Sequence, residues 1–414
     1  MYDVIVVGAR CAGSPAAMLL ARRGHRVLLV DKATFPSDTP STHFLHTPAV
    51  ACLRRWGLLD QVMATGCPPI TEILWGMQDI YLSGPPPAWE GADFGIGPRR
   101  TVLDKILIDA ARAAGAEVRE GCTVEEILMD GDRVVGISGR DRGQRPFTAD
   151  APLVIGADGL NSVVAKAVRP REILGAPPAT AVWYSYWRGT GIKHEIFVRY
   201  DGREVFIIPT NDNSVNVMVG WRHHELRDFR KDVEGNYHAT LDLFPGIGEL
   251  VRAGERVEPF YAFSNSKQWL RVPCGPGWCL LGDAAHLKDP VAGIGITDAF
   301  RSAEAMVDAI DDVLRGRRPA EQAFAAYESW RDQTFTEAFG QHVRAAQLNI
   351  FPADMLRIVE ACKHNDRNRI AFFGLLGALN PMREFFTPDN CARILADAEA
   401  ATGRPWSPTA PISF

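Results

Sequence analysis

Three separate segments place glycine beside residues that bind phosphorylated or hydroxylated ligands. They are Gly8 to Gly13, Asp158-Gly159 and Gly282-Asp283. Glycine lets a backbone approach a ligand closely, and a helix that starts beside it offers free N–H groups to an anion. A carboxylate in such a turn accepts hydrogen bonds from ligand hydroxyl groups. We therefore expect a ligand with anionic and hydroxyl groups to bind at these segments.

Residues 2–31 follow the order strand, glycine-rich turn, short helix, strand. This order is typical of a dinucleotide-binding unit, in which the helix N-terminus faces a pyrophosphate and an acid ending the second strand holds ribose hydroxyls. Arg10 replaces the usual middle glycine, so its side chain either crowds the phosphates or places a guanidinium beside them. A unit that binds nothing is the alternative. The predicted cofactor-binding residues here are Gly8, Arg10, Cys11, Ala12, Gly13, Asp31 and Lys32.

The third segment leads through a proline-glycine loop into a helix. From Ile296 onward, apolar residues recur at spacings of three and four, and Gly316 ends the pattern. The positive end of such a helix favours an anion or an electron-rich ring.

Two histidines, His43 and His46, lie in a polar loop after the second strand, on the ligand side of the predicted sheet. We expect a catalytic or substrate-orienting role, because histidine transfers protons near neutral pH. The alternative is a loop histidine that only hydrogen-bonds the cofactor or the backbone. Lys288 either stabilises a peroxide anion or an acidic substrate, or faces solvent. The pair His223-His224 lacks a third ligand, so no metal site is predicted.

The elements that must position these residues predict an α/β fold. A doubly wound, Rossmann-like domain is expected from residues 1–69, 97–168 and 276–316, including an antiparallel meander over 118–149. An inserted antiparallel β-sheet domain is expected from residues 70–96 and 169–275, to which residues 257–270 return. Residues 317–414 form a C-terminal helical region, with a loosely docked tail from Gly403.

One strand of the inserted domain, residues 182–187, is aromatic on both faces. Trp183 and Trp187 share one face, and Tyr184 and Tyr186 share the other. We predict that Trp183, Tyr184 and Tyr186 bind a flat apolar substrate, although an ordinary sheet core would produce the same pattern.

The composition of the chain limits the classes of function that are compatible with the sequence. The chain has 414 residues, 46% apolar and 23% charged, with a net charge of −5. These values suit a soluble globular enzyme and give no electrostatic case for binding nucleic acid or anionic membranes. No apolar run reaches the roughly 18 residues of a membrane span. We expect no signal peptide, a cytoplasmic location, and reduced thiols for the 8 cysteines.

Together, the three glycine-acid segments resemble those of flavoprotein monooxygenases of the aromatic-hydroxylase type and of their relatives, the geranylgeranyl reductases and flavin-dependent halogenases. The resemblance covers residues 1–315 and implies FAD as the cofactor. The FAD contacts that it implies are Arg100 for the flavin chain, Val124 for the adenine, Asp158, Asp283 for the ribityl and pyrophosphate groups, and Pro290, Gly293, Gly295 and Ile296 for the isoalloxazine ring.

The chain has mixed features within this group. Residues 283–286, Asp-Ala-Ala-His, are similar to the hydroxylases, whereas the segment from Gly293 lacks their Asn-x-Gly step and is closer to the reductases and halogenases. The halogenase motif Trp-x-Trp-x-Ile-Pro is absent, and Thr-Pro-Ser-Thr-His at residues 39–43 replaces the Pro-Cys-Gly-Gly of the reductases. Ala165 stands where an arginine linked to NADPH use is usual.

The resemblance implies an FAD-dependent monooxygenase. Such an enzyme receives electrons from NADPH or NADH, or through a partner reductase, and reacts with dioxygen to form a flavin C4a-hydroperoxide. It would hydroxylate or epoxidise a small aromatic or polyketide-like substrate. The alternatives are an FAD-dependent reductase of an isoprenoid double bond and a flavoprotein that uses FAD without redox chemistry.

Overall fold

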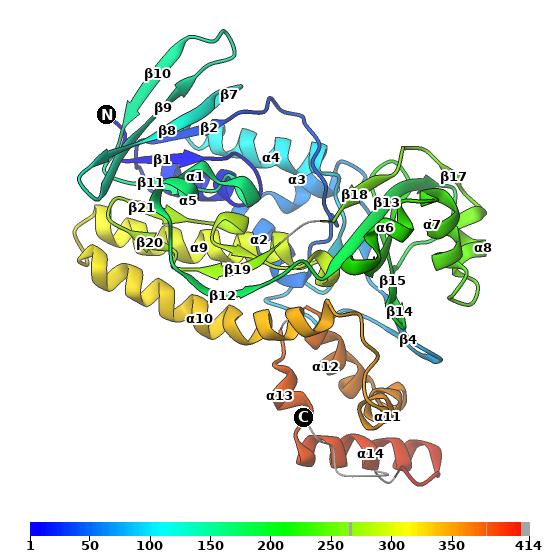
Figure 1. Ribbon diagram of the computed structural model, residues 1–414. Coiled ribbons are helices and arrows are strands. Elements are labelled where there is room, and N and C mark those ends of the chain that lie inside the picture. The colour runs from blue at the N-terminus through cyan, green and yellow to red at the C-terminus, as the bar shows by residue number, and fades with distance from the viewer. Residues whose placement is uncertain (265–266, 378, 407–414) are drawn as a thin grey trace.

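The computed structural model describes residues 1–264, 267–377 and 379–406. Figure 1 shows an α/β part, a part built on a large sheet beside it, and a group of C-terminal helices below both. The large sheet is antiparallel except where β14 (Glu195–Tyr200) and β4 (Ile73–Met77) pair in parallel. This arrangement confirms the mixed α/β fold with an antiparallel sheet and a helical C-terminal region. Most of the tail after Gly403 lies outside the described residues.

A six-stranded sheet in the order β20-β21-β11-β1-β2-β7 forms the centre of the α/β part, and all neighbours except β20 and β21 pair in parallel. Strand β1 is buried at every position, as expected for a parallel sheet covered on both faces. The carboxyl ends of parallel strands share one edge, so the three glycine-acid segments meet there. The strands are β1 (Val4–Val7), β2 (Val27–Asp31), β7 (Glu117–Glu120), β11 (Val154–Gly156), β20 (Cys274–Gly275) and β21 (Trp278–Leu280).

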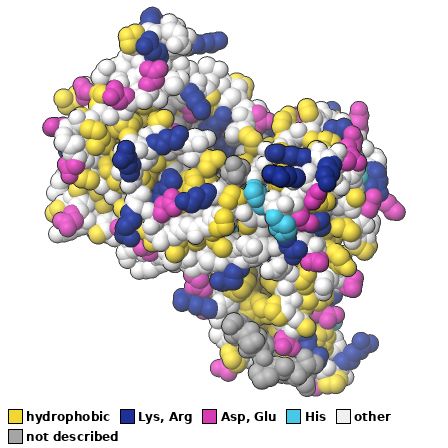
Figure 2. All heavy atoms as spheres, in the orientation of Figure 1, with side chains coloured by type: hydrophobic (Ala, Val, Ile, Leu, Met, Phe, Trp, Pro, Cys, Tyr) yellow, Lys and Arg dark blue, Asp and Glu magenta, His cyan; other side chains and the backbone are white. Residues whose placement is uncertain are grey.

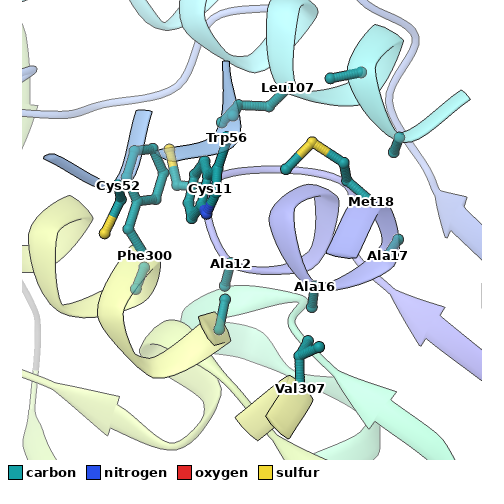
Figure 3. Close-up of a cluster of buried hydrophobic side chains, with 14 of the residues drawn as sticks. Cys11, Ala12, Ala16, Ala17, Met18, Cys52, Trp56, Leu107, Phe300 and Val307 are labelled. Atoms are coloured by element: carbon teal, nitrogen blue, oxygen red, sulfur yellow. The ribbon is translucent and has the colours of Figure 1, made fainter. Parts of the chain in front are cut away.

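Helices cover one face of this sheet. They are α1 (Gly13–Arg22), α4 (Arg100–Ala113) and α9 (Gly295–Leu314), joined by α2 (Thr47–Trp56) and α3 (Leu59–Met63). Figure 3 shows Ala16 and Met18 of α1 in one apolar cluster with Leu107 of α4 and with Phe300 and Val307 of α9. This packing fixes the N-termini of α1 and α9 relative to the strand ends.

A small antiparallel sheet and α5 (Val163–Val168) cover the other face. Its strands are β8 (Thr123–Asp130), β9 (Arg133–Arg140) and β10 (Pro146–Asp150). The predicted start of this meander at residue 118 is wrong, because residues 117–120 form β7 and pair in parallel with β2. Gly121, with φ of +67°, separates β7 from β8, so the two strands join different sheets.

The inserted part is built on an eight-stranded sheet in the order β17-β13-β16-β15-β14-β4-β5, with β18 also paired to β13. Its strands are β4 (Ile73–Met77), β5 (Ile80–Gly84), β13 (Thr180–Arg188), β14 (Glu195–Tyr200), β15 (Arg203–Thr210), β16 (Ser214–Arg222), β17 (Glu255–Arg256) and β18 (Tyr261–Phe263). Apolar side chains of α6 (Leu226–Phe229), α7 (Val233–Leu241) and α8 (Ile247–Arg252) pack against one face of it.

A separate three-stranded sheet joins this part to the segment after Asp283. It consists of β12 (Glu172–Ala176), β19 (Gln268–Arg271) and β22 (His286–Leu287). The prediction that residues 257–270 return to the large sheet is therefore correct only for β18, since β19 pairs with β12 and β22. A two-stranded pair, β3 (Pro69–Ile70) and β6 (Gly95–Ile96), lies at the junction.

The C-terminal helices close the edge of the large sheet. Trp75 of β4 packs edge-on against Phe372, with ring centres 4.8 Å apart, inside an apolar cluster that the last helices supply. These helices are α11 (Ala353–Ala361), α12 (Asp366–Leu376), α13 (Met382–Phe385) and α14 (Pro388–Thr402). The helix before them, α10 (Ala320–Ala345), packs against α9. Within the described residues, no helix has the length and apolar character needed to cross a membrane. Figure 2 shows positive and negative side chains interspersed over the face in view.

Candidate FAD-binding and active site

The turn between β1 and α1 accepts only glycine at two positions. Gly8 has φ of +101°, and a Cβ there would lie 2.4 Å from the Ala157 carbonyl oxygen. A Cβ on Gly13 would lie 1.8 Å from the carbonyl oxygen of Gly8. No side chain caps the N-terminus of α1. The N–H of Ser14 donates to the Arg10 carbonyl oxygen at 3.0 Å and Pro15 has no N–H, so the first turn attracts an anion mainly through the positive end of the helix dipole.

Asp31 is fixed at the end of β2 by two backbone groups. Its carboxylate accepts hydrogen bonds from the N–H of Ala9 and of Ala33, both at 2.7 Å. Each carboxylate oxygen keeps a further lone pair for a ligand hydroxyl. Lys32, the next residue, is exposed.

Arg10 points toward α4. Its guanidinium donates to Asp104 at 2.5 Å, and Arg100 donates to the same carboxylate at 3.0 Å through two nitrogens. The thiol of Cys11 also lies 3.3 Å from Asp104, whose side chain is fully buried. Asp104 therefore ties the glycine-rich turn to Arg100. Sequence reasoning missed this role, although Asp104 stands one helical turn after Arg100, where such pairs form.

The three glycine-acid segments touch one another. Gly8 abuts Ala157, which precedes Asp158, and a Cβ on Gly282 would lie 2.9 Å from the Cβ of Ala12. Burial raises the pKa of the Asp283 carboxyl to about 6, against the opposing charge of Arg100. The Oδ1 atom of Asp158 is buried without a hydrogen-bond partner among the described residues.

Val124 begins the meander beside the end of β2. It is buried on β8, where the register with β9 shifts between Val124 and Glu126. Such a shift leaves backbone groups outside the regular ladder. Ser162 accepts a hydrogen bond from the N–H of Ala165 and so caps the N-terminus of α5.

The loop that contains Pro290 leads to an uncapped helix start. Gly293 has φ of +61°, and no side chain caps the N-terminus of α9. A Cβ on Gly295 would meet no atom within 4 Å, so space is open beside the first turn, which also includes Ile296. An uncapped helix N-terminus next to open space suits an electron-rich ring.

Lys288 does not face solvent. Its ammonium group is buried and forms an ion pair with Asp298 in the first turn of α9. His286 lies in the same buried group, and burial together with the charge of Lys288 holds its pKa well below the usual value. The ion pair between Lys288 and Asp298 stabilises the first turn of α9.

The side chain of His43 contacts the large sheet at Tyr186 of β13. His43 is fully buried with φ of +62°, and its Nε2 atom is hydrogen bonded to the hydroxyl of Tyr186. The guanidinium carbon of Arg99 lies 3.7 Å from the centre of the Tyr186 ring. Burial, with added repulsion from Arg100 and Arg99, holds the pKa of His43 well below its usual value, so the imidazole is neutral at pH 7.

The aromatic side chains of residues 182–187 lie in two different environments, one on each face of the strand. Tyr184 and Tyr186 face the α/β part, and Tyr261 stacks on Tyr184 with ring centres 5.3 Å apart. Trp183 lies on the opposite face, stacked on Phe229 with centres 3.7 Å apart, inside the core under α6 and α7. The structure therefore does not bring Trp183 together with the two tyrosines, because alternate residues of a strand point to opposite faces.

His46 lies apart from His43, at the N-terminus of α2. Its N–H donates to the hydroxyl of Thr297 in α9, at 3.3 Å. It lines a small enclosed cavity with Phe44 and with Glu195 of β14. The Oε2 atom of Glu195 is buried without a hydrogen-bond partner among the described residues, and burial raises its pKa to about 8. Sequence reasoning missed Glu195, since an acid in a β-strand usually faces solvent.

FAD fits the residues that meet at this edge. Uncapped helix starts at α1 and α9 suit the pyrophosphate and the flavin ring, respectively. The unpartnered Asp158 oxygen and the open space at Gly295 are further features that a bound cofactor would satisfy. Within the described residues, no group of three or more His, Cys, Asp or Glu side chains could hold a metal ion.

These features define a flavin-binding protein. A family model described as an FAD binding domain matches residues 1–341, so the chain belongs to this family. The match confirms the resemblance to FAD-dependent oxidoreductases.

Relatives in this family differ in their named reactions. The chain is 26% identical over 346 residues to a tryptophan 2-halogenase of Chondromyces crocatus, covering 78% of this chain and 64% of the halogenase. It is 27% identical over 403 residues to a digeranylgeranylglycerophospholipid reductase of Methanosarcina acetivorans, covering 92% and 93% of the two chains. It is 25% identical to a 6-hydroxy-3-succinoylpyridine 3-monooxygenase of Pseudomonas putida, covering 81% and 85%.

Solved structures share the whole fold. A flavin-dependent brominase superposes with a TM-score of 0.77 at 19% identity, covering 96% of this chain and 98% of the brominase. The myxobacterial chondrochloren halogenase gives a TM-score of 0.74 at 21% identity, covering 97% of each chain. At these identities the likeness establishes the fold alone.

Proposed function

We propose that this protein is an FAD-dependent monooxygenase that hydroxylates or epoxidises a small aromatic or polyketide-like substrate. The observation that carries the proposal is the buried His43–Tyr186 hydrogen bond between the α/β part and the aromatic face of the large sheet. Arg100, which we assign to the flavin chain, carries a positive charge that acts to lower the pKa of both His43 and Asp283.

In this proposal, each segment binds one part of FAD. Residues 8–13 bind the pyrophosphate, Asp31 the adenosine ribose, Val124 the adenine, and Asp283 the ribityl chain. The start of α9 binds the ring, and its dipole favours negative charge there. Bound FAD supplies the redox chemistry, with electrons from NADPH or NADH, or through a reductase partner, and with dioxygen as co-substrate.

His43 and Tyr186 handle protons in this proposal. In the tautomer whose Nε2–H donates to the Tyr186 hydroxyl oxygen, the Nδ1 lone pair of the neutral imidazole accepts a proton from a substrate hydroxyl, and the hydrogen bond to Tyr186 holds the ring in place. Burial raises the pKa of Tyr186, so the phenol remains protonated and its O–H can donate to the substrate. The aromatic surface of Tyr184 and Tyr261 supports a flat substrate and excludes water from the site.

The proposal is tested with the FAD-loaded protein, NADPH and a panel of hydroxylated and keto aromatic compounds under ¹⁸O₂. We expect flavin reduction, oxygen-dependent reoxidation and one ¹⁸O atom in the product. Turnover of substrate without oxygen would contradict the proposal and favour reduction of a double bond. A flavin that neither nicotinamide nor a reductase can reduce would favour a non-redox role.

A further inference from the structure

A cavity of about 190 Å³ opens between α9, α10 and the C-terminal region, outside the residues assigned above. Its lining combines a guanidinium, carboxamides, a hydroxyl and an indole ring. The lining residues that matter here are Trp89, Arg301, Thr334, Gln341, Leu379 and Asn380. This combination suits a small anionic group attached to an aromatic or apolar body.

Arg301 is the unusual member of this lining. Its guanidinium carbon lies 5.6 Å from the centre of the Trp89 ring and 5.9 Å from that of Phe335. Among the described residues, no hydrogen bond or ion pair holds the guanidinium. The other charged residue of the lining, Glu337, is already paired with Arg383 at 2.9 Å. Arg301 therefore leaves an uncompensated positive charge and free donors facing the cavity.

A second, smaller cavity lies beside this one. Leu379 lines both this cavity and the smaller enclosed one that contains Phe44, His46 and Glu195. The smaller cavity holds about 10 Å³, space for roughly one water molecule, so it has no room for an aromatic or apolar group. A ligand of the larger cavity is therefore held by the residues of that cavity alone.

Helix geometry separates Arg301 from the expected site of the flavin ring. Gly295 begins α9, and Arg301 stands six residues later on the same helix. At a rise of 1.5 Å per residue, the two positions are about 9 Å apart along the axis. Since α9 is packed against the parallel sheet, this spacing is fixed by the fold.

We propose that this cavity binds a small ligand whose oxyanion, a carboxylate or a phosphate, contacts Arg301 while its aromatic or apolar body lies against Trp89. The inference does not depend on the proposed oxygenation at the flavin ring. Arg301 selects the ligand by its charge. The carboxamide of Gln341 donates one of its two N–H groups to Glu337 at 3.3 Å, which leaves the other for the ligand.

The test measures equilibrium binding to the FAD-loaded protein in three arms, without nicotinamide. The probes are biphenyl-4-carboxylate, its neutral isostere biphenyl-4-carboxamide, and biphenyl-4-yl phosphate. We expect the carboxylate or the phosphate to bind roughly tenfold more tightly than the carboxamide, as a charge-assisted hydrogen bond predicts. Whichever oxyanion binds more tightly identifies the natural group.

Variants assign the effect to Arg301. Arg301→Met keeps an unbranched side chain against Trp89 and Phe335 but removes the charge, so oxyanion affinity should fall to that of the carboxamide, whose own affinity should not change. Arg301→Lys should recover part of the difference. Arg344→Met, which removes an exposed arginine of α10 outside the cavity lining, is the matched control and should have no effect. FAD content and thermal unfolding confirm that each variant is folded.

Equal affinity for the three probes, no measurable oxyanion binding, or full oxyanion affinity in Arg301→Met would overturn the inference. Because binding is measured without turnover, this result is separate from the oxygenation test. Oxyanion binding without ¹⁸O incorporation would leave the binding site in place and remove the monooxygenase function.

Discussion

The imidazole of His43 and the hydroxyl of Tyr186 are hydrogen bonded across 143 residues of sequence, with ring centres 5.6 Å apart. His43 comes from the loop after β2, and Tyr186 from the large sheet. The bond therefore joins the cofactor-binding part to the inserted part, at the interface where a substrate would lie.

Removing either partner should slow oxygenation without loss of FAD. We expect His43→Asn to lower kcat roughly 100-fold, the usual contribution of a general acid or base. Tyr186→Phe should lower it roughly tenfold, because it loses one hydrogen bond. Steady-state rates and bound FAD measure both effects. Tyr184→Phe is the matched control, and an equal loss of rate in that variant would show that the effect is not specific to the hydrogen bond with His43.

Asp283→Ala should weaken FAD retention by roughly tenfold or more, because it removes the carboxylate that we propose accepts hydrogen bonds from the ribityl hydroxyl groups. The FAD-to-protein ratio after dialysis and a titration of the apoprotein measure this change. Asp212→Ala, at an exposed turn, serves as the control. Unchanged FAD occupancy in Asp283→Ala would refute the assignment of the ribityl chain to this residue.

Glu195 should make stability depend on pH. Its folded pKa of about 8 lies above the usual value of 4.5, so the folded state binds an extra proton between these limits. Stability then falls as pH rises from about 4.5 to 8, by an amount on the order of a few kcal/mol. Denaturant unfolding at several pH values should show that Glu195→Gln removes this loss. An identical pH profile in the wild type and the variant would mean that Glu195 is solvated.

Trp183 should contribute to stability and not to substrate binding. Because it is buried against Phe229, we expect Trp183→Ala to lower the free energy of unfolding by about 3–5 kcal/mol. The milder Trp183→Phe should keep the KM of the wild type. A raised KM in Trp183→Phe, with normal thermal unfolding, would show that Trp183 contributes to substrate binding.

The FAD-binding family and the glycine turns that we expect to hold the cofactor could be predicted from the sequence alone. Residues 8–13, 158–159 and 282–283 each combine a strand end with glycine at a turn, and these are local requirements of backbone conformation and close approach. The helix α9 was likewise visible, because its apolar period is a property of consecutive residues.

Only the tertiary structure decided which residues meet across the parts. It placed Trp183 in the core and Tyr186 on His43, because the choice of strand face depends on what packs against each side. In the folded chain Lys288 is buried in an ion pair with Asp298, Glu195 lines one cavity, and Arg301 lines another. Local patterns identify elements, whereas burial, charge compensation and contacts between distant segments exist only after the chain has folded.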